Sequence, residues 1–177
     1  MGGLAAILIY CLIKKLSFWQ LGDIAAPGAI LGQAIGRVGC LVNGCCYGLT
    51  CELPLAFIYQ NPNSYAPHGV PLYPTQLFHI IWDLAGFGIL WALRKKLRPD
   101  GSLFLVWLIF FAAGDFVIRF FRENEVFLFN LPQAQLLDIL IIAIAVVILA
   151  VRLIQYRHAK LATEAADINK IGQNPGD

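Results

Sequence analysis

Charged residues are scarce in this sequence, and their scarcity excludes a domain that faces water on all sides. Of its 177 residues, 14% are charged and 59% are hydrophobic, whereas soluble domains carry about a quarter charged residues. The formal net charge of +2 says little about partners by itself, and no nucleic-acid partner is expected. With a mean hydropathy of +0.69, the chain is expected to lie in a membrane.

Familiar enzyme signatures are also missing. No nucleotide-binding loop, nucleophile elbow or internal repeat occurs in the sequence. The cysteines lack the Cys-x-x-Cys pairs typical of zinc sites, so no metal site is expected among them. No organic cofactor is expected either. Cys11 is expected to be a small core residue. Two interpretations stay open for Cys40, Cys45, Cys46 and Cys51: a disulfide among them, or simple packing in a loop.

Long apolar runs dominate what the sequence does contain. Candidate membrane spans cover residues 4–13, 21–42, 76–93, 103–118 and 136–153. A spanning helix needs about 20 residues, which four of the runs meet or approach and the first does not. Backbone polar groups in lipid must be satisfied internally, so the runs are expected to be helices. The prediction is an all-α, polytopic membrane helix bundle of about five spans over residues 1–155, followed by a polar cytoplasmic tail over residues 156–177.

The basic residues predict how the bundle is oriented. They gather at residues 14–15, 94–98 and 152–160, whereas segments 44–75 and 123–132 contain no lysine or arginine. Basic loops stay in the cytoplasm, so five crossings would put the N-terminus outside and the C-terminus inside. An outer N-terminus with a short first run indicates that upstream sequence is missing. A signal peptide is the alternative, but its positive charges would precede the apolar stretch.

Polar residues inside the spans mark candidate functional positions. Arg37 falls near the outer end of the second span, with Gln33 one turn earlier on the same face. Arg37 either snorkels to the lipid headgroups or binds a lipid phosphate with its planar guanidinium. Small residues at Gly28, Gly32 and Gly36 form a stripe that permits close helix contact. In the third span, His79 and Asp83 lie one turn apart and are candidates for a pair inside the bundle.

The densest motif is residues 36–48, which we call the glycine–cysteine segment. Its four glycines allow the backbone to fold back or approach another group closely. Two interpretations stay open here. The segment either holds an anionic lipid at the headgroup level or is a re-entrant turn that only ends the helix.

In order along the chain, these elements resemble the signatures of the prolipoprotein diacylglyceryl transferase family. The glycine–cysteine segment matches the family's Gly-Arg-x-Gly, Asn-Gly and closing Gly, and the spacing from Asp23 to Arg37 is similar. Residues 1–4 resemble the tail of a His-Gly-Gly-Leu motif, and residues 73–78 resemble His-Pro-Ser-Gln-Leu-Tyr. Residues 119–123 resemble the late Arg-Phe element of the family.

The resemblance implies transfer of a diacylglyceryl group from phosphatidylglycerol to the lipobox cysteine of a prolipoprotein. Phosphatidylglycerol, prolipoprotein signal peptides and membrane lipids are then the expected partners, and the bacterial cytoplasmic membrane is the expected location. Arg37, Arg119 and Glu123 are the implied catalytic residues. The implied substrate-binding residues are Arg37, Asn43, Gly48, Gln33, Asp23, Gln76 and Tyr73.

Several positions depart from the family pattern. Met1 and Tyr73 stand where the family has histidine, Cys40 where it has asparagine, and Cys45 where it has glutamate. A shifted alignment of the late element would make Asp115 and Arg119 a charge-swapped pair. One hypothesis from these changes is a thiol relay through Cys45. The alternative function is therefore an impaired relative that binds lipid or a partner protein.

Overall fold

A computed structural model shows that four long helices make up most of the protein. It describes Cys11, Ile13, Lys14 and residues 17–52, 54–122 and 131–173, with side chains described up to residue 164. The helices are α2 (Phe18–Asn43), α3 (Thr75–Leu93), α4 (Ser102–Ile118) and α5 (Gln133–Gln173), and a 3₁₀ turn, η1 (Arg119–Phe121), follows α4.

Each of the four helices is long and apolar enough to cross a membrane, taking α4 together with η1. This confirms the all-α, polytopic membrane bundle. The first predicted span, residues 4–13, lies almost wholly outside the described residues, so the count of five stays a prediction.

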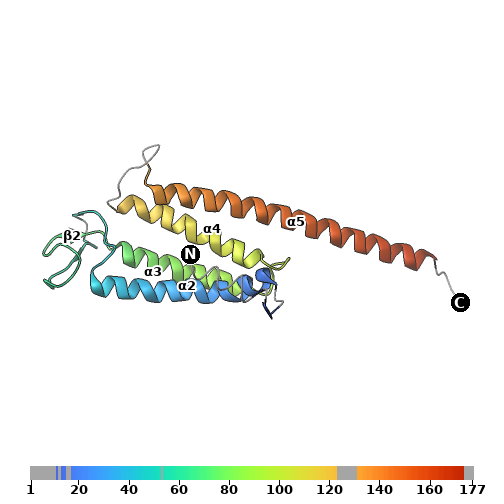
Figure 1. Cartoon of the computed structure of the whole chain (residues 1–177), viewed down its shortest axis with the longest axis horizontal. Coiled ribbons are helices and arrows are strands. Elements are labelled where there is room, and N and C mark those ends of the chain that lie inside the picture. Colours follow the sequence, from blue (N-terminus) through green and yellow to red (C-terminus); the bar gives the residue numbers. More distant parts are fainter. Residues whose placement is uncertain (1–10, 12, 15–16, 53, 123–130, 174–177) are drawn as a thin grey trace.

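The helices lie side by side along their length (Figure 1). α2 packs on α3, α4 packs on α5, and α4 also contacts both α2 and α3. The connection between α2 and α3 carries a small antiparallel hairpin of β1 (Phe57–Ile58) and β2 (Pro71–Leu72). We call the end of the bundle that carries this hairpin the loop end. The opposite end carries the connection between α3 and α4.

On α2, the contact face differs from the one that the sequence indicates. No described atom lies within 4 Å of a Cβ built on Gly28, Gly32 or Gly36. The buried positions recur instead at Gly22, Ala26, Ile30 and Ala34. At Gly86 of α3, an added Cβ would lie 2.5 Å from Ile30 Cδ1, so the absence of a side chain there lets Ile30 of α2 pack against α3. Among the described residues, the close contact that the glycine stripe permits is not made through these three glycines.

Basic residues of the connection after α3, together with Arg152 of α5, lie at the end opposite the hairpin. The guanidinium carbon of Arg94 lies 3.2 Å from the ring centre of Trp91 at the end of α3. That of Arg152 on α5 lies 4.1 Å from the ring centre of Trp19 at the start of α2. Segments far apart in sequence thus place their positive charges at one level, the arrangement that the positive-inside rule requires.

Asp23 serves the fold at this basic end. Its carboxylate accepts hydrogen bonds from the backbone N–H groups of Gly101 (2.6 Å) and Phe104 (2.8 Å), in the first turn of α4. Gly101 has no side chain to cap α4, so a carboxylate from α2 satisfies those donors and favours the helix dipole. Asp23 and Arg37 are fourteen residues apart on α2, about 21 Å along its axis. Asp23 thus has a structural role in capping α4, and its assignment to the substrate site stays a prediction.

Replacing Asp23 by alanine is expected to lower the free energy of unfolding by about 1 kcal/mol, the usual cost of a lost helix cap. Thermal unfolding in detergent would measure the effect. Gln20→Ala is the matched control, because Gln20 makes only an exposed hydrogen bond to Asp100 at the same end. An unchanged midpoint for Asp23→Ala would contradict the capping role.

α5 does not stop where its composition changes. The helix continues past residue 155 to Gln173 and extends well beyond the other three (Figure 1). The boundary between transmembrane domain and polar tail is thus a change of composition within one helix. The tail assignment itself stays a prediction.

Candidate active site

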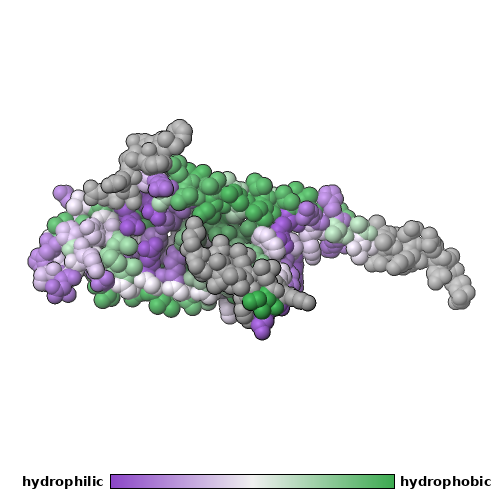
Figure 2. All heavy atoms as spheres, viewed as in Figure 1, coloured by the Kyte–Doolittle hydropathy of each residue, from purple (hydrophilic) through white to green (hydrophobic). Residues whose placement is uncertain are grey.

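A group of polar side chains is buried between the helices near the loop end. In Figure 2, hydrophilic residues continue from the loop end into the space between apolar helices. Polar groups at such depth are costly in lipid and usually mark a functional interior. Each of the following is at most 6% exposed: Thr75, Gln76, His79, Asp83, Asp115, Gln135 and Asp138.

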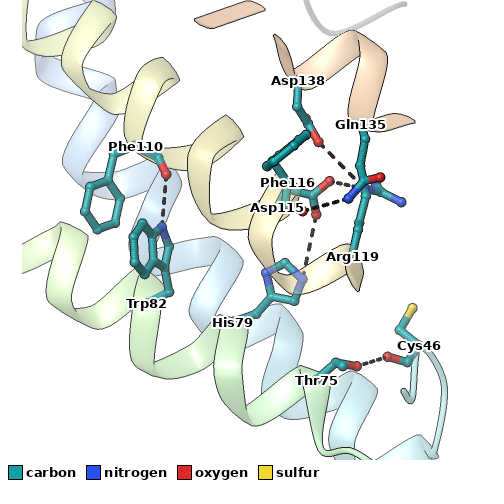
Figure 3. Close-up of polar contacts among 10 residues, drawn as sticks. All are labelled: Cys46, Thr75, His79, Trp82, Phe110, Asp115, Phe116, Arg119, Gln135 and Asp138. Atoms are coloured by element: carbon teal, nitrogen blue, oxygen red, sulfur yellow. Dashed lines mark hydrogen bonds and ion pairs between the residues drawn. The ribbon is translucent and has the colours of Figure 1, made fainter. Parts of the chain in front are cut away.

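Asp115 lies at the centre of this group (Figure 3). Its Oδ2 accepts a hydrogen bond of 2.5 Å from Arg119 Nε, one turn later. Its Oδ1 lies 3.7 Å from His79 Nε2 of α3, and Arg119 Nε lies 3.8 Å from Asp138 Oδ2 of α5. Side chains from α3, α4 and α5 therefore meet around one carboxylate, that of Asp115.

His79 does not pair with Asp83 as the sequence suggests. The partner of His79 is Asp115 on another helix. Asp83 Oδ2 is buried and has no hydrogen-bond partner among the described residues. The i, i+4 spacing put the two side chains on one face of α3, but the approach of α4 supplies the closer carboxylate.

Arg37 faces the same interior from α2. It lies six residues before the end of the helix, about 9 Å along the axis. Its guanidinium interacts electrostatically with both His79 and Asp83. Within the described part of the chain, no hydrogen bond or ion pair engages this half-buried cation. Gln33, one turn earlier, is also half-buried.

The first residues of α3 anchor the glycine–cysteine segment. Gln76 Nε2 donates to the carbonyl of Cys45 at 2.7 Å, and Thr75 Oγ1 donates to that of Cys46 at 2.7 Å (Figure 3). Gln76 Nε2 also lies 3.3 Å from the hydroxyl of Tyr59. Gln76 was expected to bind substrate, and in this structure its amide nitrogen positions the loop.

Gly48 lies where three segments meet. Its N–H donates to Tyr73 O at 3.0 Å, and the next N–H, of Leu49, donates to Phe121 O at 2.8 Å. A Cβ on Gly48 would lie 2.5 Å from Phe121 O and 2.9 Å from Thr75 Cγ2. Only glycine allows the loop to pass between the start of α3 and η1, because any side chain would push them apart.

The other predicted site residues lie at the loop end or outside the described chain. Asn43, the last residue of α2, is exposed, and its carbonyl accepts from Tyr65 N–H at 3.3 Å. The ring of Tyr73 packs against Phe121 with centroids 5.4 Å apart. Glu123 lies outside the described residues. The structure thus places Arg37, Arg119, Gln76, Gly48, Tyr73 and Asn43 towards one end of the bundle, with Gln33 nearer the middle of α2.

The five cysteines are all free thiols. Cys11 is buried, as expected for a small core residue. The sulfurs of Cys40, Cys45 and Cys46 lie within 4.8 Å of one another. Burial and the two neighbouring thiols raise the pKa of Cys45 to about 11. A thiol that stays protonated near neutral pH is a poor base, which argues against the relay through Cys45.

Two polar residues of α5 were not expected at the site. Gln135 Nε2 donates to Phe116 O at 2.9 Å, and Asp138 faces Arg119. The signal available in the sequence was a carboxylate near the start of an otherwise apolar run. Asp138 is far from Asp115 in the sequence, so the sequence did not show that both carboxylates lie near Arg119.

The fold and its buried charges define a multi-pass membrane protein with a polar site near one membrane face. A sequence profile of prolipoprotein diacylglyceryl transferase matches residues 1–151, and the chain belongs to this family.

Several relatives named phosphatidylglycerol–prolipoprotein diacylglyceryl transferase are similar to this chain. The protein from Dehalococcoides mccartyi strain 195 is 46% identical over 145 residues, covering 82% of this chain and 56% of the relative. A Clostridium perfringens protein named as transferase 2 is 38% identical over 124 residues, covering 70% and 48%. The chain therefore spans about half the length of the curated relatives that it matches.

Proposed function

We propose that this chain transfers the diacylglyceryl group of phosphatidylglycerol to the thiol of a lipobox cysteine in a prolipoprotein. The observation that carries the proposal is Arg37, a half-buried arginine that no described carboxylate neutralises at bonding distance. A guanidinium binds phosphate oxygens through two parallel hydrogen bonds. The family membership and the names of the relatives support the same reaction.

The chemistry is a displacement at a glycerol carbon. The substrate thiol loses its proton and its sulfur forms a new C–S bond. The C–O bond to phosphate breaks, and glycerol phosphate leaves with the electron pair. The thiolate is the reactive form, so a base must take the proton. His79 is the imidazole inside the bundle, since His68 and His158 are exposed.

Arg37 and Arg119 have different parts in this proposal. Arg37 binds the phosphate of the lipid and offsets the charge that develops as glycerol phosphate leaves. Arg119 is held by Asp115 at 2.5 Å and faces Asp138, so its charge is already partly compensated. It serves as the second, weaker contact for the leaving phosphate.

The proposed location is the bacterial cytoplasmic membrane, with the loop end on the outer side. The basic residues at the opposite end support this orientation, because positive segments remain in the cytoplasm. Prolipoprotein substrates would then meet the site where their signal peptides emerge.

Replacing Arg37 by alanine is expected to lower the initial rate of transfer about 100-fold, the loss typical of one electrostatic contact in the transition state. Arg37→Lys should recover part of the rate, because lysine keeps the charge without the planar fork. The assay follows acyl-labelled phosphatidylglycerol onto a lipobox peptide with the full chain in lipid vesicles.

Arg98→Ala is the matched control, because Arg98 is an exposed arginine at the basic end. Wild-type transfer by Arg37→Ala would reject the phosphate-binding role. Binding of phosphatidylglycerol by the wild-type chain without any transfer would reject the enzyme and favour a lipid-binding relative.

A further inference from the structure

We infer that Cys40, Cys45 and Cys46 form a binding site for a soft, thiophilic metal ion. Their three sulfurs lie within 4.8 Å of one another, which makes them the metal-ligand cluster found among the described residues. In a zinc site with metal–sulfur bonds of about 2.3 Å, neighbouring sulfurs lie about 3.8 Å apart. The three sulfur atoms therefore need to move only about 1 Å closer together to bind one ion.

The backbone brings these thiols together although their spacing is not that of Cys-x-x-Cys pairs. Cys40 lies in the last turn of α2, and Gly44 ends the helix in a left-handed conformation with φ of 71°. Cys45 N–H then donates to Cys40 O at 3.1 Å, which folds the chain back on the helix. Cys46 is also left-handed, with φ of 60°, a conformation uncommon outside glycine.

Contacts from α3 hold this arrangement before any ion binds. Thr75 and Gln76 donate to the carbonyls of Cys46 and Cys45, each at 2.7 Å. The backbone of both cysteines is therefore fixed by buried side chains of another helix, which lowers the entropic cost of assembling the ligands.

The surroundings suit an ion bound by three thiolates. Each of the three cysteines is only partly buried. A cavity of about 310 Å³, lined by Cys46, Tyr47, Gly48 and Arg122, gives access from the loop end. Three thiolates around a divalent ion carry a net negative charge, which Arg37, one turn before Cys40, and Arg122 would offset.

Three thiolates favour soft ions such as Zn²⁺ and Cu⁺ and leave a fourth position open to water. On binding, three S–H bonds break, three protons pass to solvent and three metal–sulfur bonds form, without any oxidant. A disulfide would use only two of the thiols and leave the third unexplained. The metal site stands apart from the transferase proposal, because it needs neither lipid nor peptide.

The test loads the reduced full chain in detergent with Zn²⁺, removes excess ion and measures bound metal per chain by elemental analysis. One ion per chain is expected. Cys40→Ser, Cys45→Ser and Cys46→Ser should each weaken retention at least about 10-fold. Cys51→Ser is the matched control and should retain the ion, because Cys51 lies outside the cluster. Cd²⁺ loading should give thiolate-to-metal absorption that the same three variants lose.

Alkylation of the reduced chain gives a readout that does not depend on one variant's folding. Bound Zn²⁺ should protect three of the five thiols, and Arg98→Ala, which changes an exposed arginine at the opposite end of the bundle, should show the same protection. Substoichiometric binding, equal loss in Cys51→Ser, or an intramolecular disulfide that forms in place of metal binding would each overturn the inference.

Discussion

Asp115→Ala is expected to lower the free energy of unfolding by about 3 kcal/mol, the low end of the cost of breaking a buried ion pair. Asp115 accepts from Arg119 at 2.5 Å and lies 3.7 Å from His79, and its side chain is 8% exposed. Removing it leaves a partly buried guanidinium without its closest carboxylate. The loss stays at the low end because Asp138 still lies 3.8 Å from Arg119.

Thermal or denaturant unfolding in detergent would measure this loss. Asp138→Ala serves as the comparison and should cost clearly less, because its carboxylate is the more distant partner of Arg119. The loss in free energy of unfolding for Asp115→Asn should fall between those for Asp115→Ala and Asp138→Ala, because asparagine keeps the shape of the side chain but loses its charge. Equal midpoints for Asp115→Ala and wild type would show that the pair contributes nothing to the bundle.

Gly48→Ala is expected to have the second large effect, a loss of about 2 to 3 kcal/mol from overpacking. The added methyl would lie 2.5 Å from Phe121 O, a backbone atom that cannot move without disturbing η1. Relief would break the hydrogen bond from Leu49 N–H to that same carbonyl. Transfer should fall as well, because Arg119 begins η1.

Gly39→Ala provides the matched control for this substitution. Gly39 belongs to the same glycine–cysteine segment, but no described atom lies within 4 Å of an added Cβ there. Alanine favours helix more than glycine, so this control should be neutral or slightly stabilising. A similar loss at both positions would contradict the packing role of Gly48.

The spans could be predicted because hydropathy is a local property. Four of the apolar runs became helices whose ends differ by only a few residues from the predicted ones, apart from the extension of α5. The glycine stripe on α2 did not identify the packed face, because small residues allow contact without requiring it. Which face packs was decided by Ile30 meeting Gly86, a pairing between two helices that neither run reveals alone.

The candidate site was predictable where one motif carried it and unpredictable where several helices share it. Arg37 follows from a single segment whose residues resemble a family signature. Asp115 and Asp138 come from separate helices, and only folding brings both to Arg119. Asp23 has a family-like spacing to Arg37, but the sequence did not reveal that its carboxylate caps α4 at the other end of the bundle.

The length of α5 has a mechanical consequence. Its 41 residues extend about 60 Å, roughly twice the hydrocarbon thickness of a bilayer. Residues 133–171 contain neither proline nor glycine, so no hinge interrupts the rod. A twist or tilt applied to its protruding half would be carried through the membrane to Asp138. A partner that binds the protruding half of α5 could therefore shift the position of Asp138 relative to Arg119.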